Sequence, residues 1–341
     1  MAAGSPGSEA EAGLLEAAQR GDGEAFGRLV KPHRAELHAH CYRMLGSFHD
    51  AEDVFQEALL RAWRALPRFG GQKRLRPWLF KIATNACLDA LKQRPKRLLP
   101  KDYGPPLSPA DSPGQPVGEP IWIEPYPDRQ LGLATGLAGP EAVFEQRESV
   151  ELAFIAALQY LPAIQRGVLM LRDVLGFSTR EAAEVLDTSE VAVNSALQRA
   201  RKSVQERLPD ISQQSTLRAL GDDRVREIVD RYLDAWERGD VDALARMLAA
   251  DATFAMPPYP SWWRGRDVIA AFASEPIHRY LPARANGQMA NAAYRWDPGK
   301  GVYAADALEV LTLQGQLVKE MTAFRMPQLF PHFGLPHQLS P

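Results

Sequence analysis

The chain has 341 residues, enough for two or three domains, and its 45% hydrophobic and 24% charged residues are typical of a globular protein. No apolar run is long enough to cross a bilayer, and the small, acidic N-terminal residues do not resemble an export signal, so we expect a cytoplasmic protein without membrane contact. Cys41 and Cys87 lie outside any CxxC or Cys/His cluster. This disfavours a disulfide framework and a metal site, and it predicts two buried thiols.

The formal net charge of -2 hides a strong segregation of charge along the chain. Residues 48–60 carry four acids and no Lys or Arg, whereas residues 61–98 carry eleven Lys or Arg and one acid, Asp89. Neighbouring surfaces of opposite sign predict two different partners.

The first block, residues 14–98, has apolar residues at helical spacing and predicts an all-helical domain. We expect Asp50 to cap its second helix and a third helix to begin near Pro77. A Gly-Gly loop, clustered cations and a Trp-bearing helix suit strand-separated DNA, because cations bind phosphates and aromatic rings hold unstacked bases. The competing interpretation is a solvated basic face with the tryptophan in the core. The DNA-binding residues expected in this block are Lys73, Arg74, Arg76, Trp78, Lys81 and Asn85.

Residues 99–139 form a proline-rich segment. Nine of the chain's 27 prolines fall between residues 100 and 127, so neither a helix nor a sheet is expected to persist there. Tyr103, Trp122 and Tyr126 can dock on another surface, but a spacer is the preferred interpretation.

The second block, residues 140–208, predicts a helix-turn-helix at residues 179–198. Ser178 and Glu181 form a capping-box pattern that opens a short helix, and Ser189 can cap a longer one after a turn at Asp187. We expect the second helix to enter the major groove, although a helical unit of this kind can also simply pack. The residues expected on base edges or phosphates are Ser189, Glu190, Ala192, Asn194, Ser195, Gln198, Arg199, Arg201 and Lys202.

After a linker at 209–221, the third block, residues 222–330, predicts an α+β domain followed by a tail at 331–341. Two amphipathic helices precede strands expected at 251–256, 287–294, 302–313 and 316–324. Asp306 shares a strand face with apolar residues and is the best candidate for an acid in a ligand cup, and His278 is a weaker one. A lone acid on a strand is more often structural. Trp262 and Trp263 are expected to line either the mouth of the cup or an interface.

Three stretches resemble known families. DAEDVFQEALLRAWRAL followed by LRPWLFKIATNACLDAL resembles region two of extracytoplasmic-function sigma factors of the sigma-70 family, and LPAIQRGVLMLRDVLGFSTREAAEVLDTSEVAVNSALQRARKSV resembles their region four. The last block is similar to the SnoaL-like, cone-shaped α+β domain, which implies a regulator of polymerase binding. The fold class implied is therefore multidomain, with two all-α domains and a C-terminal α+β SnoaL-like barrel.

The resemblance also implies the partners. The basic module would open the minus-ten element of promoter DNA, and region four would read the minus-thirty-five element. The core RNA polymerase would be contacted at its β′ clamp helices and β flap. The residues that would dock on the clamp helices are Asp50, Asp53, Gln56 and Glu57.

The function predicted is that of a sigma factor whose activity is modulated by its C-terminal domain, with an unknown small ligand there and no catalytic residue, cofactor or metal. One alternative is a ligand-responsive DNA-binding regulator that acts without polymerase, which leaves the basic module without a role. Another is a cyclase or isomerase that depends on Asp306. Relatives often carry Lys or Arg at the positions of Asn194 and Ala196 and Gly at that of Asp187, so the promoter preference does not carry over.

Overall fold

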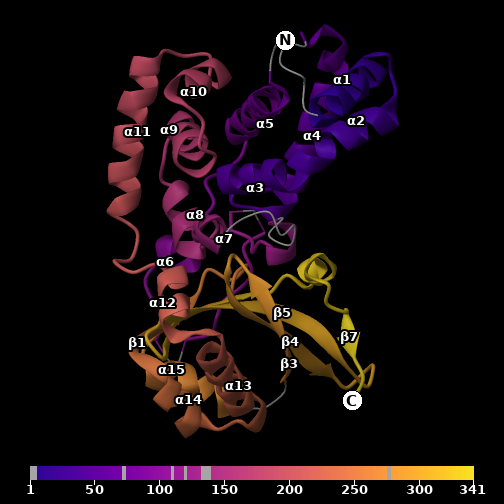
Figure 1. Ribbon diagram of the computed structural model, residues 1–341. Helices are drawn as coiled ribbons and strands as arrows, with labels where there is room; N and C mark the ends of the chain where they lie inside the picture. Colours follow the sequence, from indigo (N-terminus) through magenta and orange to yellow (C-terminus); the bar gives the residue numbers. More distant parts are fainter. Residues whose placement is uncertain (1–5, 71–73, 109–110, 119–120, 132–139, 275–277) are drawn as a thin grey trace. The chain divides into compact units, whose positions relative to one another are not determined.

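The computed structural model describes residues 6–70, 74–108, 111–118, 121–131, 140–274 and 278–341, and it divides into two compact units (Figure 1). The helical unit comprises residues up to 94 together with residues 160–206. The sheet unit comprises residues 95–159 and 207–341. The division falls inside the expected second block, since residues 140–159 belong to the sheet unit. No helix among the described residues has the length and apolarity needed to span a membrane.

The helical unit is built from short helices around buried apolar side chains such as Leu37, Met44 and Phe80. Ser47 caps the second long helix by accepting a hydrogen bond from the Asp50 amide at 3.1 Å. The expectation that Asp50 is the cap was therefore wrong. Asp50 lies in the first turn, where its negative charge suits the helix dipole. The helices are α1 (Pro6–Gln19), α2 (Gly23–Val30), α3 (Arg34–Leu45), α4 (Phe48–Ala65), α5 (Leu75–Leu91), α9 (Ala163–Leu169), α10 (Thr179–Val185) and α11 (Glu190–Gln205), with a π-helical turn, η5, at Met170–Val174.

Helix α5 begins two residues before the expected Pro77. Trp78 is partly buried in a cluster with Phe69, and their ring centroids are 4.7 Å apart. Cys41 and Cys87 are both 0% exposed, which confirms the prediction of two buried thiols. The apolar face of α5 therefore closes the core of the helical unit.

Helices α10 and α11 form the predicted helix-turn-helix with the predicted caps. The Ser178 hydroxyl accepts from the Glu181 amide at 3.2 Å, and the Glu181 carboxylate accepts from the Ser178 amide at 2.8 Å. Asp187 takes the left-handed conformation with φ 49, which Asp tolerates. Ser189 caps α11 by accepting from the Ala192 amide at 3.2 Å. The capping-box prediction and the turn prediction are confirmed.

The sheet unit consists of one β-sheet and the helices that pack on it. In the described residues its strand order is β2-β1-β6-β5-β4-β3, with β7 paired to β5; β1 and β6 are parallel and the other pairs are antiparallel. The strands are β1 (Leu248–Ala255), β2 (Trp262–Arg264), β3 (His278–Ala285), β4 (Gln288–Asp297), β5 (Val302–Gln314), β6 (Leu317–Phe324) and β7 (Gln338–Leu339). The helices are α6 (Pro100–Tyr103), α7 (Pro140–Glu148), α8 (Leu152–Leu158), α12 (Gln213–Leu220), α13 (Asp222–Arg238), α14 (Val241–Met247) and α15 (Arg266–Ala270).

The core of the sheet unit lies between the sheet and helices α13, α14 and α15, which gather on one side of it (Figure 1). Tyr232 and Trp236 of α13 pack there with Leu311 of β5 and Met321 of β6. Four strands were predicted from the sequence, and β2, β3 and β7 were not. Strand β3 has Pro282 at its centre, which an edge strand tolerates but which hides the strand pattern.

The proline-rich segment is docked on the sheet unit, so the expectation of a spacer was wrong. Trp122 and Tyr126 are 2% and 0% exposed. The Tyr126 amide donates to the Asn286 side chain at 2.9 Å, and the Tyr126 carbonyl accepts from the Asn286 amide at 2.9 Å. Prolines prevent long helices, but an extended chain with buried aromatics can still pack against a sheet.

Candidate nucleic-acid interface

Helix α11 presents a polar stripe opposite a buried apolar one. Val193 and Leu197 are buried against the helical unit. Most of the expected base-reading residues are exposed, namely Glu190, Ala192, Asn194, Ser195, Gln198 and Arg199. A recognition helix needs this division, because its reading side chains must be free while the backbone is held rigidly.

The other predicted DNA-binding residues of the helix-turn-helix differ in whether their side chains already pair with another group. Lys202 is exposed, whereas the Arg201 guanidinium is paired with the Asp173 carboxylate through contacts of 2.8 and 2.6 Å. Ser189 is exposed, and its hydroxyl is occupied by the cap. Arg201 must exchange its pairing with Asp173 for a phosphate if it is to contact DNA.

Helix α5 places Lys81 and Asn85 half-buried on its polar side. Thr84 of the same helix is fully buried, with its hydroxyl 2.9 Å from His40 Nε2. Trp78 lies in the apolar cluster, as the competing interpretation of the sequence had it. Lys73 lies outside the described residues. The polar side of α5 therefore offers a lysine and an amide, with Arg74 and Arg76 at its N-terminus.

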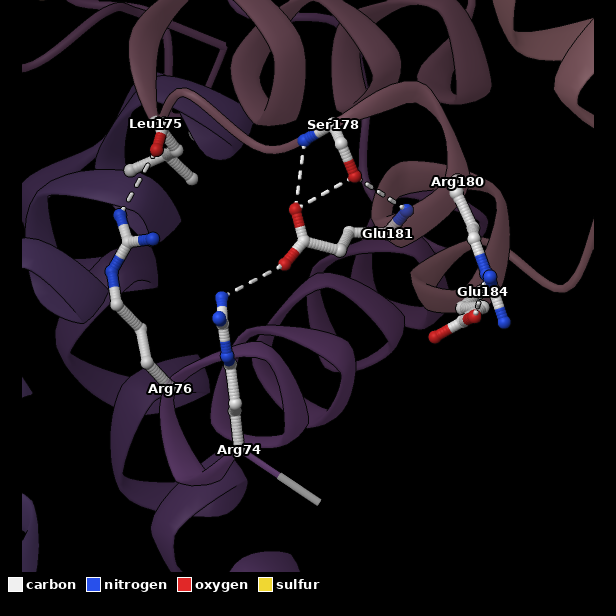
Figure 2. A network of polar contacts seen from close by, with 7 residues as sticks. All are labelled: Arg74, Arg76, Leu175, Ser178, Arg180, Glu181 and Glu184. Atoms are coloured by element: carbon white, nitrogen blue, oxygen red, sulfur yellow. Dashed lines mark hydrogen bonds and ion pairs between the residues drawn. The ribbon is translucent and has the colours of Figure 1, made fainter. Parts of the chain in front are cut away.

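Arg74 and Arg76 point toward the segment that leads into and forms α10 (Figure 2), and Lys81 contacts the same segment. Arg74 lies 3.7 Å from the Glu181 carboxylate, and Arg76 donates to the Leu175 carbonyl at 3.0 Å. Lys81 donates to the Glu184 carbonyl at 2.8 Å and to the Asp187 carboxylate. Hydrogen bonds from the Ser178 amide and hydroxyl, followed by the charge of Arg74, hold the pKa of Glu181 below its usual range. Sequence reasoning missed this network because the partners lie about a hundred residues apart along the chain.

Helix α4 carries the acidic surface. Asp53, Gln56 and Glu57 are exposed, and Glu57 pairs with Arg61 at 2.9 Å. Asp50 stands apart from these residues, because it pairs with Arg94 and its side chain is only 15% exposed.

Leu60 of the same helix is 50% exposed, one turn beyond Gln56 and Glu57. Sequence reasoning missed this residue, although its departure from the apolar stripe was a usable signal. An exposed leucine among acids gives the surface an apolar centre, which interfaces commonly have.

The sheet unit contains a cavity of about 200 Å³. Asp306 lines it, with its carboxylate 2.6 Å from Arg325 and 3.3 Å from His278. Among the described residues the lining includes aromatic side chains but neither Trp262 nor Trp263. Trp263 packs in the core, 1% exposed, and the Trp262 indole donates to the Gly104 carbonyl at 2.7 Å.

A second acid, Glu309, also lines the cavity. The register of β5 against β4 shifts at Asp306, so that this residue forms a β-bulge and the alternation of faces resets after it. Asp306 and Glu309 therefore reach one cavity although their spacing is odd. Glu309 was not predicted from the sequence, although an acid inside the apolar run of β5 was the available signal.

The pKa values of the two acids are shifted in opposite directions. Burial raises the pKa of Glu309 to about 7, against weaker opposing hydrogen bonds that include one from the Tyr232 hydroxyl at 3.1 Å. Burial by itself would also raise the pKa of Asp306, but hydrogen bonds from His278 and Arg325 outweigh it and hold the pKa below its usual value. Near neutral pH the cavity thus pairs an ionised carboxylate with an acid close to its midpoint.

Comparison with known proteins defines the class of each part of the chain. Residues 29–97 match the family model for sigma-70 region 2, residues 151–204 match sigma-70 region 4, and residues 229–321 match the SnoaL-like domain. The fold class expected from the sequence is confirmed, while the domain boundaries remain predictions.

The relatives define the family. The ECF RNA polymerase sigma factor SigG of Mycobacterium tuberculosis is 42% identical over 330 residues, covering 94% of this chain and 86% of that protein. The sigma factor SigJ of the same organism is 29% identical over 257 residues, covering 73% of this chain and 72% of that protein. The crystal structure of the extracytoplasmic function sigma factor SigJ shares the fold, with a TM-score of 0.54 and 24% identity over 89% of this chain and 97% of that one.

The chain belongs to the family of ECF RNA polymerase sigma factors. It is a sigma factor for promoter recognition, as the sequence predicted. The alternative of a regulator that acts without polymerase is not favoured.

Proposed function

We propose that three surfaces divide the work of initiation. The acidic face of α4 contacts the β′ clamp helices of the core enzyme, the N-terminal half of α5 holds the opened minus-ten strand, and α11 reads the minus-thirty-five element while region four lies on the β flap. The observation that carries the proposal is the segregation of an exposed acidic helix from an adjoining basic one. Polymerase supplies the catalytic chemistry, and the chain supplies position and specificity.

On α11 the residue types fit base readout. Asn194 and Gln198 can pair with adenine, Arg199 with guanine, and Glu190 can accept from cytosine. Lys202 is free to bind a phosphate without sequence preference. The promoter element that α11 reads would therefore contain both adenine and guanine, contacted from adjacent turns of α11.

Replacing Lys81 and Asn85 together by alanine tests the role of α5. We expect promoter opening to fall about tenfold, because a charge-assisted phosphate contact and an amide hydrogen bond are lost. Affinity for core enzyme should stay within about twofold, since α4 is untouched. Permanganate reactivity of the opened strand and a core-binding titration measure the two effects. The control is the Glu16→Ala, Arg20→Ala variant, which removes an exposed pair at the C-terminal end of α1. Equal losses of opening and of core binding would contradict the assignment.

We propose that the C-terminal domain modulates this activity by holding a small ligand in the cavity of Asp306 and Glu309. Aromatic walls would take an apolar body, and protonated Glu309 can donate to a carbonyl or hydroxyl oxygen of the ligand. A fixed, ion-paired Asp306 suits orientation of the ligand more than proton transfer.

The protonation of Glu309 predicts a pH dependence of stability. Because its pKa is raised on folding, the folded state binds the proton more tightly, and stability falls as pH rises from about 4.5 to about 7. The raised pKa of Glu309 should lower the free energy of unfolding by on the order of 3 kcal/mol over this pH range, and Glu309→Gln should abolish that contribution. Burial also raises the pKa of Glu151 to about 7, so the stability of the Glu309→Gln variant should still fall somewhat over the same pH range. Urea unfolding at pH 5 and pH 8, followed by tryptophan fluorescence, measures the difference. A variant with the wild-type pH dependence would contradict a protonated Glu309.

A further inference from the structure

The cavity of the sheet unit has one charged edge. His278 of β3 is the cross-strand partner of Arg295 of β4, so their side chains project from the same face of the sheet. Asp306, at the bulge of β5, lies 3.3 Å from His278, and Arg325, directly after β6, lies 2.6 Å from Asp306. All four residues line the cavity. Charged side chains from four neighbouring segments therefore meet at one edge.

Arg295 is the member of this edge whose charge is not balanced. The Asp306 carboxylate is paired with the Arg325 guanidinium and contacts His278. Arg295, by contrast, is exposed and forms no ion pair with any residue that the structure describes. A guanidinium binds a carboxylate through two parallel hydrogen bonds. Because Asp306 lies at the same edge, a singly charged carboxylate fits Arg295 better than a doubly charged phosphate would.

The second acid of the lining does not oppose an anionic ligand strongly. Burial raises the pKa of Glu309 to about 7, so near neutral pH this side chain carries only part of a negative charge. The ion pair of Arg325 with Asp306 accounts for the other acid. The charge of Arg295 therefore leaves the edge of the cavity positive.

Three alanines form the floor of the cavity. Ala293 of β4, Ala307 of β5 and Ala323 of β6 line it, and each is no more than 6% exposed. Ala293 and Ala307 are cross-strand partners. Methyl groups on neighbouring strands leave a shallow, flat surface, whereas longer side chains would fill the space. A planar apolar group therefore fits this floor.

The walls of the cavity are aromatic. Phe254 of β1 and Phe272 of the 3₁₀ helix η6 (Ala271–Ser274) have ring centroids 5.5 Å apart at an interplanar angle of 63°. Phe272 also packs against Trp263 at 5.0 Å, yet 40% of Phe272 remains exposed. Aromatic rings gain from edge or offset contacts with a further ring. We therefore expect an aromatic ligand to bind more tightly than a saturated one of the same size.

The volume of the cavity limits the size of the ligand. The cavity measures about 200 Å³. An apolar cavity of ~150 Å³ is enough to hold one benzene molecule, and pockets for drug-sized ligands begin near ~300 Å³. The cavity of the sheet unit therefore has room for one ring that carries a small polar group.

We propose that this cavity binds a monocyclic aromatic carboxylic acid in its ionised form, with the ring over the three alanines and the carboxylate on the Arg295 guanidinium. The inference rests on the proposed function, in which the C-terminal domain holds a small ligand. The negative charge of Asp306 directs the ligand carboxylate toward Arg295, which is exposed at the rim of the cavity.

Calorimetric titration of the full-length chain with three probes tests the ligand class. Benzoate carries both the ring and the charge, benzamide keeps the ring without the charge, and cyclohexanecarboxylate keeps the charge without the aromatic ring. We expect benzoate to bind about tenfold more tightly than benzamide, since benzamide lacks the charge-assisted contact with Arg295. Benzoate should also bind about threefold more tightly than cyclohexanecarboxylate, which cannot extend the aromatic cluster.

Replacing Arg295 locates the anion. Arg295→Gln should lower benzoate affinity about tenfold and leave benzamide affinity within about twofold, because only the charged contact is removed. Arg295 is exposed, so the fold should not change. The control is Arg246→Gln, which removes the same charge from an exposed residue of α14 that does not line the cavity as the structure describes it. This control should bind all three probes like the wild type.

Benzoate affinity no greater than that for either analogue, or unchanged by Arg295→Gln, would overturn the assignment of an aromatic acid, and the cavity would still be a ligand site. Absence of binding by all three probes would also overturn the assignment. The proposed function is then tested by Ala293→Leu, which narrows the cavity, with folding checked by circular dichroism. Transcription altered by this folded variant would uphold the proposed function, and transcription like the wild type would contradict it.

Discussion

Transcription from the chain's own promoters is expected to fall about 100-fold, ~3 kcal/mol, when Asn194 and Gln198 are both replaced by alanine. Both side chains are exposed on α11, and the helix is held by its buried stripe, so the fold should not change. Each lost amide would remove a pair of hydrogen bonds to a base edge. Run-off transcription at promoters mapped for the wild-type chain measures the loss.

The control for this experiment lies at the residue that follows the same helix. Glu206→Ala changes an exposed residue just past the C-terminal end of α11 and should leave transcription within about twofold. The double variant should also keep its affinity for core enzyme. A double variant as active as Glu206→Ala would show that α11 does not read the promoter.

The second large effect is expected at the acidic helix. Asp53→Lys together with Leu60→Ala should lower affinity for core RNA polymerase about 100-fold, because a charge is reversed and an exposed apolar anchor is removed. The loss should shrink as salt rises, since the charge component is screened. Anisotropy titrations of labelled chain with core enzyme at two salt concentrations measure both effects.

A matched variant makes the same chemical changes elsewhere. Asp230→Lys with Ile211→Ala alters an exposed aspartate and an exposed isoleucine of the sheet unit. It should bind core enzyme like the wild type. If both variants lose affinity equally, the effect belongs to net charge or stability, and α4 is not the contact surface.

Local sequence rules predicted the helix-turn-helix well because its determinants are local. The Ser178–Glu181 box, the Ser189 cap and the left-handed Asp187 each depend on residues within four positions. The same rules gave the wrong N-cap for α4, because Ser47 caps this helix and Asp50 had been predicted to do so. Both residue types cap helices, and only the path of the chain decides between them.

The candidate sites were harder to predict because they depend on long-range packing. The partners of Lys81, and the backbone carbonyl that accepts from Arg76, lie in another block of the sequence, and no spacing rule connects them. Asp306 was found from its strand, whereas Glu309 was missed because the β-bulge breaks the alternation used to assign faces. Trp262 was expected either at the mouth of the cup or at an interface; its indole hydrogen-bonds the docked proline-rich segment, which was expected to be a spacer.

The departures of the recognition helix from its family concern the promoter. Asn194 is exposed and uncharged, so it can read a base edge and adds no phosphate affinity. Ala196 is buried and faces the helical unit. The sequence of the promoter therefore has to be measured for this chain itself.

Run-off transcription from genomic fragments, with purified core RNA polymerase and the full-length chain, tests the division of labour most directly. We expect initiation at a defined set of start sites, with opening lost in the Lys81→Ala, Asn85→Ala variant and promoter choice lost in the Asn194→Ala, Gln198→Ala variant. Wild-type start sites and opening in both variants, or no start site with the wild-type chain, would contradict it.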